Sequence, residues 1–447
     1  RDQRFIDLFN MAMADIDAGL DAVARQGVDL DLSLLPARFS LAEVQAALPP
    51  GAALFLHGTA AQKVQVFVVT REGYIWFEPQ EWADEFSRRA TDLLTGIDNR
   101  EGRGADPLSG DDTPSGPGPI IAEARWLYQR PLEPAAGLLE GATRLLVSGQ
   151  GFDSVGRVPF HILLASDPAP GKTWEELDYL LRHMSVATLP TLEYLFLPLP
   201  ADDRPATYLG LADAEFWKAP QGVPRLADVQ DYSYVLRRMA RLPETRGEVM
   251  AVAGLFPGAA DVLTGAEATE AVLYDLSRDG RLREKSILHF ATHGAVFKGG
   301  DTPAVPPFLA LSAPAEEDFD HNFQPERLFG RVPDGALTAQ EVGSLDLDAR
   351  LVILSACNTA TALSEEGDGI GGLTAAFLGA GADRVLSTHW QVESRAAVRI
   401  VTNLMARDPD LQDPSEALRE VMLAELARGE RYAHPAWWGA FSLTGFP

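Results

Sequence analysis

Residues 351–360 read Leu-Val-Ile-Leu-Ser-Ala-Cys-Asn-Thr-Ala, and this stretch decides the fold class. Its first four residues are apolar without a break, which is typical of a strand buried on both faces of a parallel sheet. The apolar run ends at Ser355, and Cys357 follows two residues later. Because sites in open α/β sheets lie beyond the carboxyl ends of the strands, the stretch predicts a central strand with a candidate site at its tip.

Strands and helices alternate around this stretch throughout the second half of the chain. We predict strands at 207–211, 261–263, 286–292, 350–355 and 384–388, and helices at 246–255, 268–279, 337–345, 371–379, 396–406 and 414–427. Alternation of this kind requires crossover connections and a mostly parallel sheet with helices on both faces. The sequence therefore predicts an α/β fold.

The first half has a different pattern. Residues 1–26 carry one apolar helical stripe, which predicts a helix that packs either on this chain or against an upstream helical array. Further along, we predict strands at 52–56, 64–70, 74–77 and 144–147, helices at 80–94, 120–139 and 191–196, and a mobile surface loop at 98–119. The division that we expect is an N-terminal helical segment at 1–37, one α/β half at 38–204 and a second at 205–447.

Composition excludes several classes of protein. The 447 residues hold 38 Lys and Arg against 64 Asp and Glu, and the net charge of −26 argues against nucleic acid or an anionic membrane as the main partner. No apolar run reaches the ~20 residues that span a membrane. The single cysteine excludes an internal disulfide and favours a reducing, cytoplasmic setting. The chain begins at Arg1, so we expect a fragment or a processed product.

Neither a metal nor a cofactor is expected. The sequence has no HExxH motif and no cluster with zinc-ligand spacing. The glycine-rich run at 367–373 lacks the Lys-Ser/Thr of a phosphate-binding loop and the spacing of a dinucleotide fingerprint.

A histidine and a cysteine follow two neighbouring predicted strands. His293-Gly294 comes after the strand at 286–292, and Cys357 comes after the strand at 350–355. A thiol and an imidazole at adjacent strand tips are the groups that a cysteine nucleophile and its proton carrier require. The backbone N–H groups of Gly294 and Cys357 would then supply an oxyanion hole.

Simpler interpretations exist for both residue types. A lone cysteine at the end of a buried strand is usually an inert small hydrophobe. His289 shares a strand face with His293, but it lies in mid-strand between Leu288 and Phe290. We therefore expect His289 to be a core residue and His293 to be the one that meets a substrate.

Several stretches resemble one known family. The segments ILHFATHG at 287–294, LTAQEV at 337–342, LVILSACNTA at 351–360 and GDGIGGLTAAFLGAGADRVLSTHWQV at 367–392 are similar to the CHAT peptidases of the caspase–separase clan. The resemblance covers about residues 38–447 and includes the ending PAWWGAFSLTGFP at 435–447.

The resemblance implies a caspase-like protease half preceded by an inactive caspase-like half. His293 would be the catalytic histidine, Cys357 the nucleophile, and the N–H groups of Gly294 and Cys357 the oxyanion donors. It implies a protein substrate and bacterial regulated responses, including defence against phage. It also implies an upstream helical-repeat region or a regulatory partner.

The specificity pocket departs from the family pattern. Relatives often carry an Asp a few positions after the Trp of the Trp-x-Val segment, whereas this chain has Trp390-Gln-Val-Glu393-Ser-Arg395. Asp368 and Glu393 are the candidate pocket carboxylates beside Trp390, although Asp368 could equally cap the following helix. A basic P1 residue (the one before the cut bond) is favoured only slightly over an apolar one.

The function that we expect is a cysteine endopeptidase that works through a Cys–His dyad and a thioester. The alternatives are a catalytically silent caspase-like scaffold and an acyltransferase or other hydrolase that uses the same dyad.

Overall fold

The computed structural model describes residues 39–60, 63–79, 83–98, 118–148, 158–197, 205–216, 236, 239–295, 307–312, 334–356, 372–390 and 392–446. The helix predicted at 1–26 and nearly all of the loop expected at 98–119 lie outside these ranges. Within them, no helix has both the length and the apolar content to cross a membrane.

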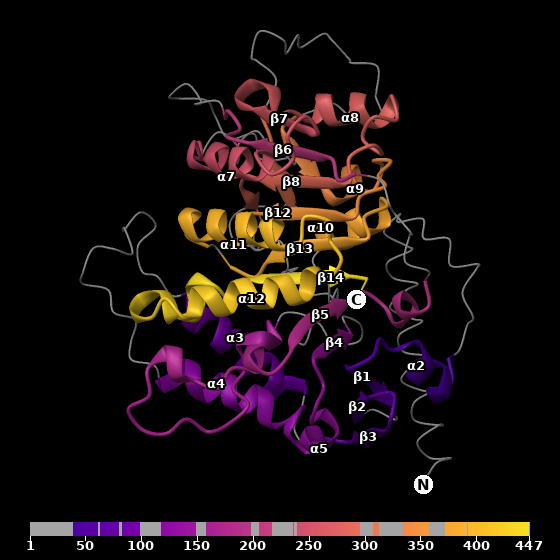
Figure 1. Cartoon of the computed structure of the whole chain (residues 1–447), viewed down its shortest axis with the longest axis vertical. Helices are drawn as coiled ribbons and strands as arrows, with labels where there is room; N and C mark the ends of the chain where they lie inside the picture. The colour runs from indigo at the N-terminus through magenta and orange to yellow at the C-terminus, as the bar shows by residue number, and fades with distance from the viewer. Residues whose placement is uncertain are drawn as a thin grey trace, which may run out of the picture.

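Eleven strands form one sheet, which runs the length of the molecule (Figure 1). Its strand order is β3-β2-β1-β4-β5-β14-β13-β12-β8-β6-β7. The strands are β1 Ala52–Ala60, β2 Lys63–Val69, β3 Tyr74–Phe77, β4 Arg144–Ser148, β5 Ser185–Leu189, β6 Tyr208–Ala212, β7 Ala260–Thr264, β8 Ile287–Ala291, β12 Leu351–Ser355, β13 Arg384–Thr388 and β14 Phe441–Gly445. Most neighbours are parallel; β1–β2, β2–β3 and β13–β14 are antiparallel. The predicted mostly parallel α/β sheet is confirmed.

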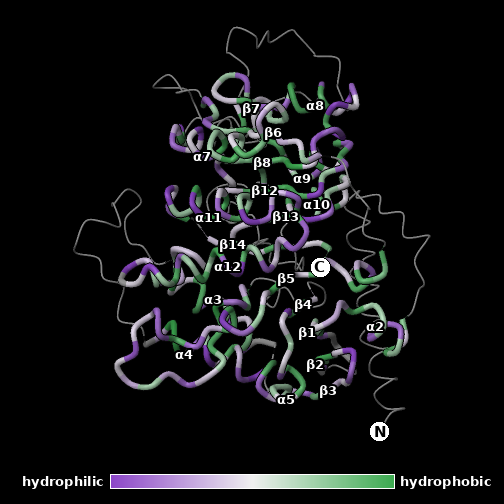
Figure 2. Tube along the Cα trace, viewed as in Figure 1, coloured by the Kyte–Doolittle hydropathy of each residue, from purple (hydrophilic) through white to green (hydrophobic). Residues whose placement is uncertain are grey.

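Side chains of the central strands alternate between two hydrophobic cores. On β12, Leu351 and Ile353 join the core that α7 (Glu244–Ala253), α11 (Ser394–Arg407) and α12 (Pro414–Leu426) cover. Val352 and Leu354 join the opposite core, under α8 (Glu270–Arg278), α9 (Ala339–Val342) and α10 (Gly372–Gly379). The two-residue period explains this division, because successive side chains point to opposite faces. Figure 2 shows hydrophobic stretches along these strands.

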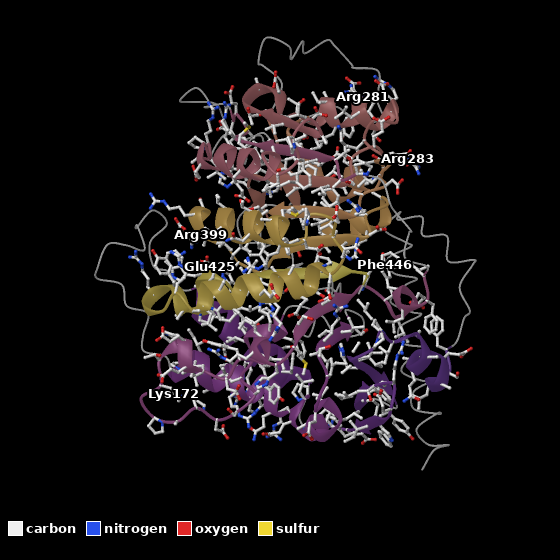
Figure 3. All side chains as sticks on the ribbon, viewed as in Figure 1. Lys172, Arg281, Arg283, Arg399, Glu425 and Phe446 are labelled. Atoms are coloured by element: carbon white, nitrogen blue, oxygen red, sulfur yellow. The ribbon has the colours of Figure 1, made fainter. Side chains whose placement is uncertain are left out.

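The first core continues without a break into the N-terminal strands, where it meets α3 (Ala83–Asp98) and α4 (Gly118–Gln129). The shorter helices α2 (Leu41–Ala47) and α5 (Ala136–Leu139) complete the set of α-helices in the described ranges. Arg399 of α11 binds both carboxylate oxygens of Glu425 of α12, with Nη2–Oε2 at 2.8 Å and Nε–Oε1 at 3.0 Å (Figure 3). A planar guanidinium suits a carboxylate in this two-point geometry, so the pair fixes the two helices against each other.

Strands β5 and β14 join the two predicted α/β halves into one sheet. Thr444 of β14 pairs with Thr188 of β5 in parallel, and β14 pairs with β13 in the antiparallel sense. The chain therefore returns from its last helix to fill the middle of the sheet. The division at 204 stays a prediction, but both sides of it contribute strands to the same sheet.

Most predicted elements are confirmed, with shifts of a few residues at their ends. The helix predicted at 337–345 is wrong in part, because Ala336–Thr338 forms β11 and Thr338 then caps α9 through a capping box with Glu341. The helix predicted at 120–139 ends at Gln129, since Pro131 disfavours helical geometry in the residue before it. The helix at 191–196 is a 3₁₀ turn over Leu192–Leu195, and the sequence did not predict β5.

Gly445 allows β14 to end against β13. Its φ of +134° is one that residues other than glycine rarely adopt. An added Cβ would also collide with the Asp383 carbonyl oxygen. We expect Gly445→Ala to lower the free energy of unfolding by more than about 1 kcal/mol in denaturant titrations. Gly137→Ala is the matched control, since Gly137 lies in α5 with no atom within 4 Å of the added Cβ, and it should leave stability equal or higher. Equal losses in the two variants would contradict this role of Gly445.

Candidate functional site

The candidate site lies at the tips of two adjacent parallel strands, β8 and β12. Ala291, the last residue of β8, pairs with Ser355, the last residue of β12. His293 follows Ala291 by two residues, and Cys357 follows Ser355 by two. Ala356 is the last described residue of this segment, so Cys357 lies outside the described residues. The register brings the starting points of both predicted catalytic segments to the same level of the sheet.

His293 is half-buried and oriented by a backbone carbonyl. Its Nε2 lies 2.7 Å from the carbonyl oxygen of Ala240, and its ring lies beside Phe216 with the ring centroids 5.8 Å apart. A carbonyl oxygen only accepts hydrogen bonds, so this contact requires a proton on Nε2. The neutral ring then has its lone pair on Nδ1, which is available to take a proton.

Hydrogen bonds fix the backbone on both sides of His293. The Thr292 hydroxyl donates to the Ala310 carbonyl at 2.5 Å, and Ala310 N–H donates to the His293 carbonyl at 2.9 Å. Gly294 lies in β9 (Gly294–Ala295), opposite Leu309 of β10 (Phe308–Ala310). Bonded and non-bonded pairs alternate in an antiparallel ladder, so the N–H of Gly294 points away from β10. That N–H is directed out of the ladder, as an oxyanion donor must be.

The end of β12 is held by the next strand. The hydroxyl of Thr388, at the tip of β13, donates to the carbonyl of Ala356. Threonines at the ends of β8 and β13 thus bond to carbonyls on each side of the candidate site, which gives the strand tips a defined backbone path.

His289 is a core histidine, as expected. Its ring is fully buried, with Nδ1 2.8 Å from the Tyr208 hydroxyl and Nε2 3.1 Å from Oε1 of Glu248. Glu248 lies on α7 and Tyr208 on β6, so this polar group ties the helix to two strands. The His289 ring has both nitrogens engaged by protein groups and does not reach the strand tips.

The residues predicted for a specificity pocket have structural partners here. Trp390 is buried in the first core, and its indole N–H donates to the Ala436 carbonyl at 3.3 Å. Glu393 is the N-cap of α11, and its Oε2 accepts the N–H of Ala396 at 2.9 Å. Asp368 lies outside the described residues. Among those that are described, no group of three or more His, Cys, Asp or Glu side chains could hold a metal ion.

The carbonyl of Ala240 is the part of the site that sequence reasoning missed. It lies two residues before LPETRGEV at 242–249, the stretch that leads into α7. A backbone oxygen leaves no mark in residue type, so only a fold could reveal it. The one feature of the sequence that could have pointed to this segment is Asp213, a polar residue directly after the buried strand β6.

A buried carboxyl group ties α8 to the segment that leads into β11. Glu270 begins α8, is fully buried, and its Oε2 accepts the N–H of Gly335 at 2.7 Å, just before β11. Burial, and to a smaller extent the nearby carboxylates of Asp334 and Glu341, raise the pKa of Glu270 to about 8. Glu270 is therefore mostly protonated at neutral pH.

The CHAT domain family model matches residues 122–446 of the chain. Among curated proteins, tetratricopeptide repeat protein 28 of Homo sapiens is 29% identical over 181 residues, and the Mus musculus protein is 30% identical over 181 residues. Each match covers 37% of this chain, which spans only 7% of the length of those relatives.

Two solved complexes show a weak structural similarity to this chain. The complex of the Porphyromonas gingivalis RgpB pro- and mature domains matches with a TM-score of 0.39 and 10% identity, over 82% of this chain and 77% of that chain. The Saccharomyces cerevisiae separase–securin complex matches with a TM-score of 0.41 and 10% identity, over 90% of this chain and 30% of that chain.

Replacing His289 or His293 by alanine should lower the free energy of unfolding by different amounts. His293→Ala loses one half-exposed hydrogen bond, and we expect a loss of about 1 kcal/mol in unfolding free energy. His289→Ala leaves the Tyr208 hydroxyl and the Glu248 carboxyl buried without their partner, and we expect a loss of about 3 kcal/mol or more. Urea titrations of both variants measure the difference, and a larger loss for His293→Ala would contradict the assignment.

Glu270 should make stability fall as pH rises. The folded state keeps a proton on Glu270 up to about pH 8, whereas the unfolded chain releases it near the ordinary glutamate pKa of 4.5. Between these values the folded state holds more protons, so unfolding becomes easier with rising pH, by up to about 1.4 kcal/mol per pH unit. Glu270→Gln should remove this slope in denaturation curves at pH 5 to 8, and an unchanged slope would contradict it.

Proposed function

The chain belongs to the CHAT domain family, and we propose that it is a cysteine endopeptidase that cleaves a protein substrate with Cys357 as nucleophile and His293 as proton carrier. The observation that carries the proposal is the register of β8 and β12. Ala291 pairs with Ser355, and each candidate residue follows two positions later.

The contacts of His293 suit the chemistry. With Nε2–H donated to the Ala240 carbonyl, Nδ1 is the nitrogen that exchanges protons with a thiol. An imidazole that is held through Nε2 can take a proton at Nδ1 and return it without reorienting. The predicted donors of the oxyanion hole are the N–H groups of Gly294 and Cys357, and the ladder directs the first of them away from β10.

The proposed reaction has two halves. The Cys357 thiol gives its proton to Nδ1 of His293, and Sγ attacks the scissile carbonyl carbon, whose electron pair moves to the oxyanion. When the C–N bond breaks, His293 returns the proton to the leaving amine and a thioester remains. Water then attacks the thioester carbon, with its proton passing through His293 to Sγ, and the acid is released.

A catalytically silent scaffold is the second candidate function. The curated relatives carry tetratricopeptide repeats in their names, which favours a repeat region or regulatory partner next to a domain of this kind. The dyad is nevertheless complete in this sequence, and the matched region contains it. A bacterial or defence role, a cytoplasmic setting and a helical segment at 1–37 stay predictions.

Selectivity for the P1 residue is a further part of the proposal. The chain carries a net charge of −26, which attracts basic segments. Glu393 caps α11 through one carboxylate oxygen, and Trp390 is buried in the first core. These contacts do not assign either residue to a substrate pocket. Sequencing the cut sites in a peptide library distinguishes a basic from an apolar P1.

Substitution of the nucleophile tests the activity. We expect Cys357→Ala to lower cleavage of a peptide library by more than about 10³-fold while the unfolding transition stays in place. His293→Ala should act similarly, because the two residues work as a unit. Retained cleavage in Cys357→Ala would refute the proposal.

The single cysteine makes a second measurement specific. Any thiol label on the intact chain reports Cys357 alone. A peptide-based electrophile should label the native chain, and His293→Ala should slow labelling, because the thiol loses its base. His183→Ala is the matched control, since His183 is exposed and paired with Asp178, far along the sheet near β5. Equal labelling of all three proteins would favour the silent scaffold.

A further inference from the structure

The segment that carries the Ala240 carbonyl is held to the sheet by one carboxylate. Asp213 follows β6 directly and is 3% exposed. Its Oδ1 accepts from Nε of Arg241 at 2.5 Å, and its Oδ2 accepts from Nη2 of Arg241 at 2.9 Å and from Nε of Arg246 at 3.1 Å. Two-point pairing of a guanidinium with a carboxylate fixes both distance and plane. Arg241 is therefore fixed in orientation as well as in position.

Asp213 is itself held in an unusual conformation. Its φ is +53°, in the left-handed region that non-glycine residues seldom occupy. Its N–H donates to the Thr245 hydroxyl at 2.9 Å, and its carbonyl accepts the N–H of Gly265, after β7, at 3.2 Å. A strained residue persists only where its surroundings determine it, and such residues gather at functional sites.

Arg241 and the histidine contact are adjacent in the chain. Arg241 follows Ala240 immediately, and the Ala240 carbonyl belongs to the peptide group that joins the two residues. Fixing Arg241 therefore fixes the plane of the carbonyl that accepts Nε2–H of His293 at 2.7 Å. The path from Asp213 to the imidazole contains one ion pair, one peptide plane and one hydrogen bond.

The charges of the described side chains in this cluster balance, so these side chains do not by themselves favour a charged ligand. Arg241 also pairs with Glu215, with Nη1–Oε1 at 3.0 Å, which makes two carboxylates against the two guanidinium groups of Arg241 and Arg246. The hydrogen bonds from Arg241 hold the pKa of Asp213 below its usual range, so the carboxylate stays charged at neutral pH. The arrangement fits a mechanical role better than a binding role.

We propose that Asp213 is a positioning residue, which through Arg241 holds the Ala240 carbonyl where it keeps the proton of His293 on Nε2 and Nδ1 facing the strand tips. The inference rests on the proposed function for its effect on catalysis. Its effect on the ring of His293 is independent of cleavage.

The first test measures the ring directly. In the intact 447-residue chain, Asp213→Asn should make the Nε2–H proton of His293 exchange with water about tenfold faster or more in NMR spectra, since an ordering loss of about 1.4 kcal/mol corresponds to a factor of ten. The ring N–H of fully buried His289 is the control in the same spectrum. Its exchange should not change, because local release of Ala240 does not open the core.

The second test asks whether the effect of Asp213 on His293 passes through its ion pair with Arg241 or follows from any loss of charge pairing at Asp213. Arg241→Gln and Arg246→Gln each remove one exposed guanidinium from the same carboxylate, but only Arg241 adjoins Ala240. Arg241→Gln should reproduce the faster exchange of Asp213→Asn, and Arg246→Gln should have a smaller effect. Both arginines are half-exposed at the surface, so these variants are expected to fold even if Asp213→Asn does not.

Kinetics give the third readout. Loss of positioning should lower kcat by about 100-fold with KM nearly unchanged, because the ring is misplaced and the substrate contacts are kept. Asp261→Asn is the control, since Asp261 on β7 pairs with Lys285 away from the site and should change neither constant.

The proposal is overturned if Asp213→Asn and Arg241→Gln keep the native exchange rate of the His293 ring, or if Arg246→Gln changes it as much as Arg241→Gln. If the native chain cleaves nothing, the proposed function fails, and ring exchange still decides whether Asp213 positions His293.

Discussion

The parallel pairing of β8 with β12 is the interaction on which the rest of the structure depends. Five residue pairs, from Ile287–Leu351 to Ala291–Ser355, align the two strands in register. A shift by one residue would turn each strand's side chains to the other face and exchange the two cores. Both faces of these strands are buried, so such a shift is strongly disfavoured. The same register sets the level at which the segments leading to His293 and Cys357 begin, so hydrophobic burial determines where β8 and β12 end relative to each other.

Helix α7 connects this core to the site. On one side, Glu248 meets His289 in the interior; on the other, the residues that lead into the helix bring the Ala240 carbonyl to His293. One short segment thus contacts both histidines, one in a buried polar group and the other at a half-exposed strand tip. The buried group links three side chains, His289, Tyr208 and Glu248, and gives the helix a single docking position. Because α7 is fixed in this position, the Ala240 carbonyl just before it is also fixed, and it can orient the His293 ring.

The sequence predicted the mostly parallel sheet and most of its elements because apolar runs and alternation depend on local residues. The predictions from sequence failed where an element depends on pairing with strands that are distant in the chain. Ser185–Leu189 has only five residues and gains its strand geometry from β4 and β14, so no local pattern revealed β5. The helix expected at 337–345 loses its first residues to β11, because pairing with β10 outweighs their helical pattern. The site followed the same rule: His293 and Cys357 were predicted from their place after strands, whereas the Ala240 carbonyl was not.

Residue types alone determined the fold class and the family and predicted the two candidate catalytic residues, because periodicity, composition and motif spacing are properties of the linear chain. Only the tertiary structure decided that residues from both halves share one sheet, that His289 is enclosed by Tyr208 and Glu248, and that His293 is held by Ala240. The physical reason is the directionality of hydrogen bonds. A donor and its acceptor must meet within about 3 Å along a defined line, and segments distant in sequence reach that arrangement only when the core has packed.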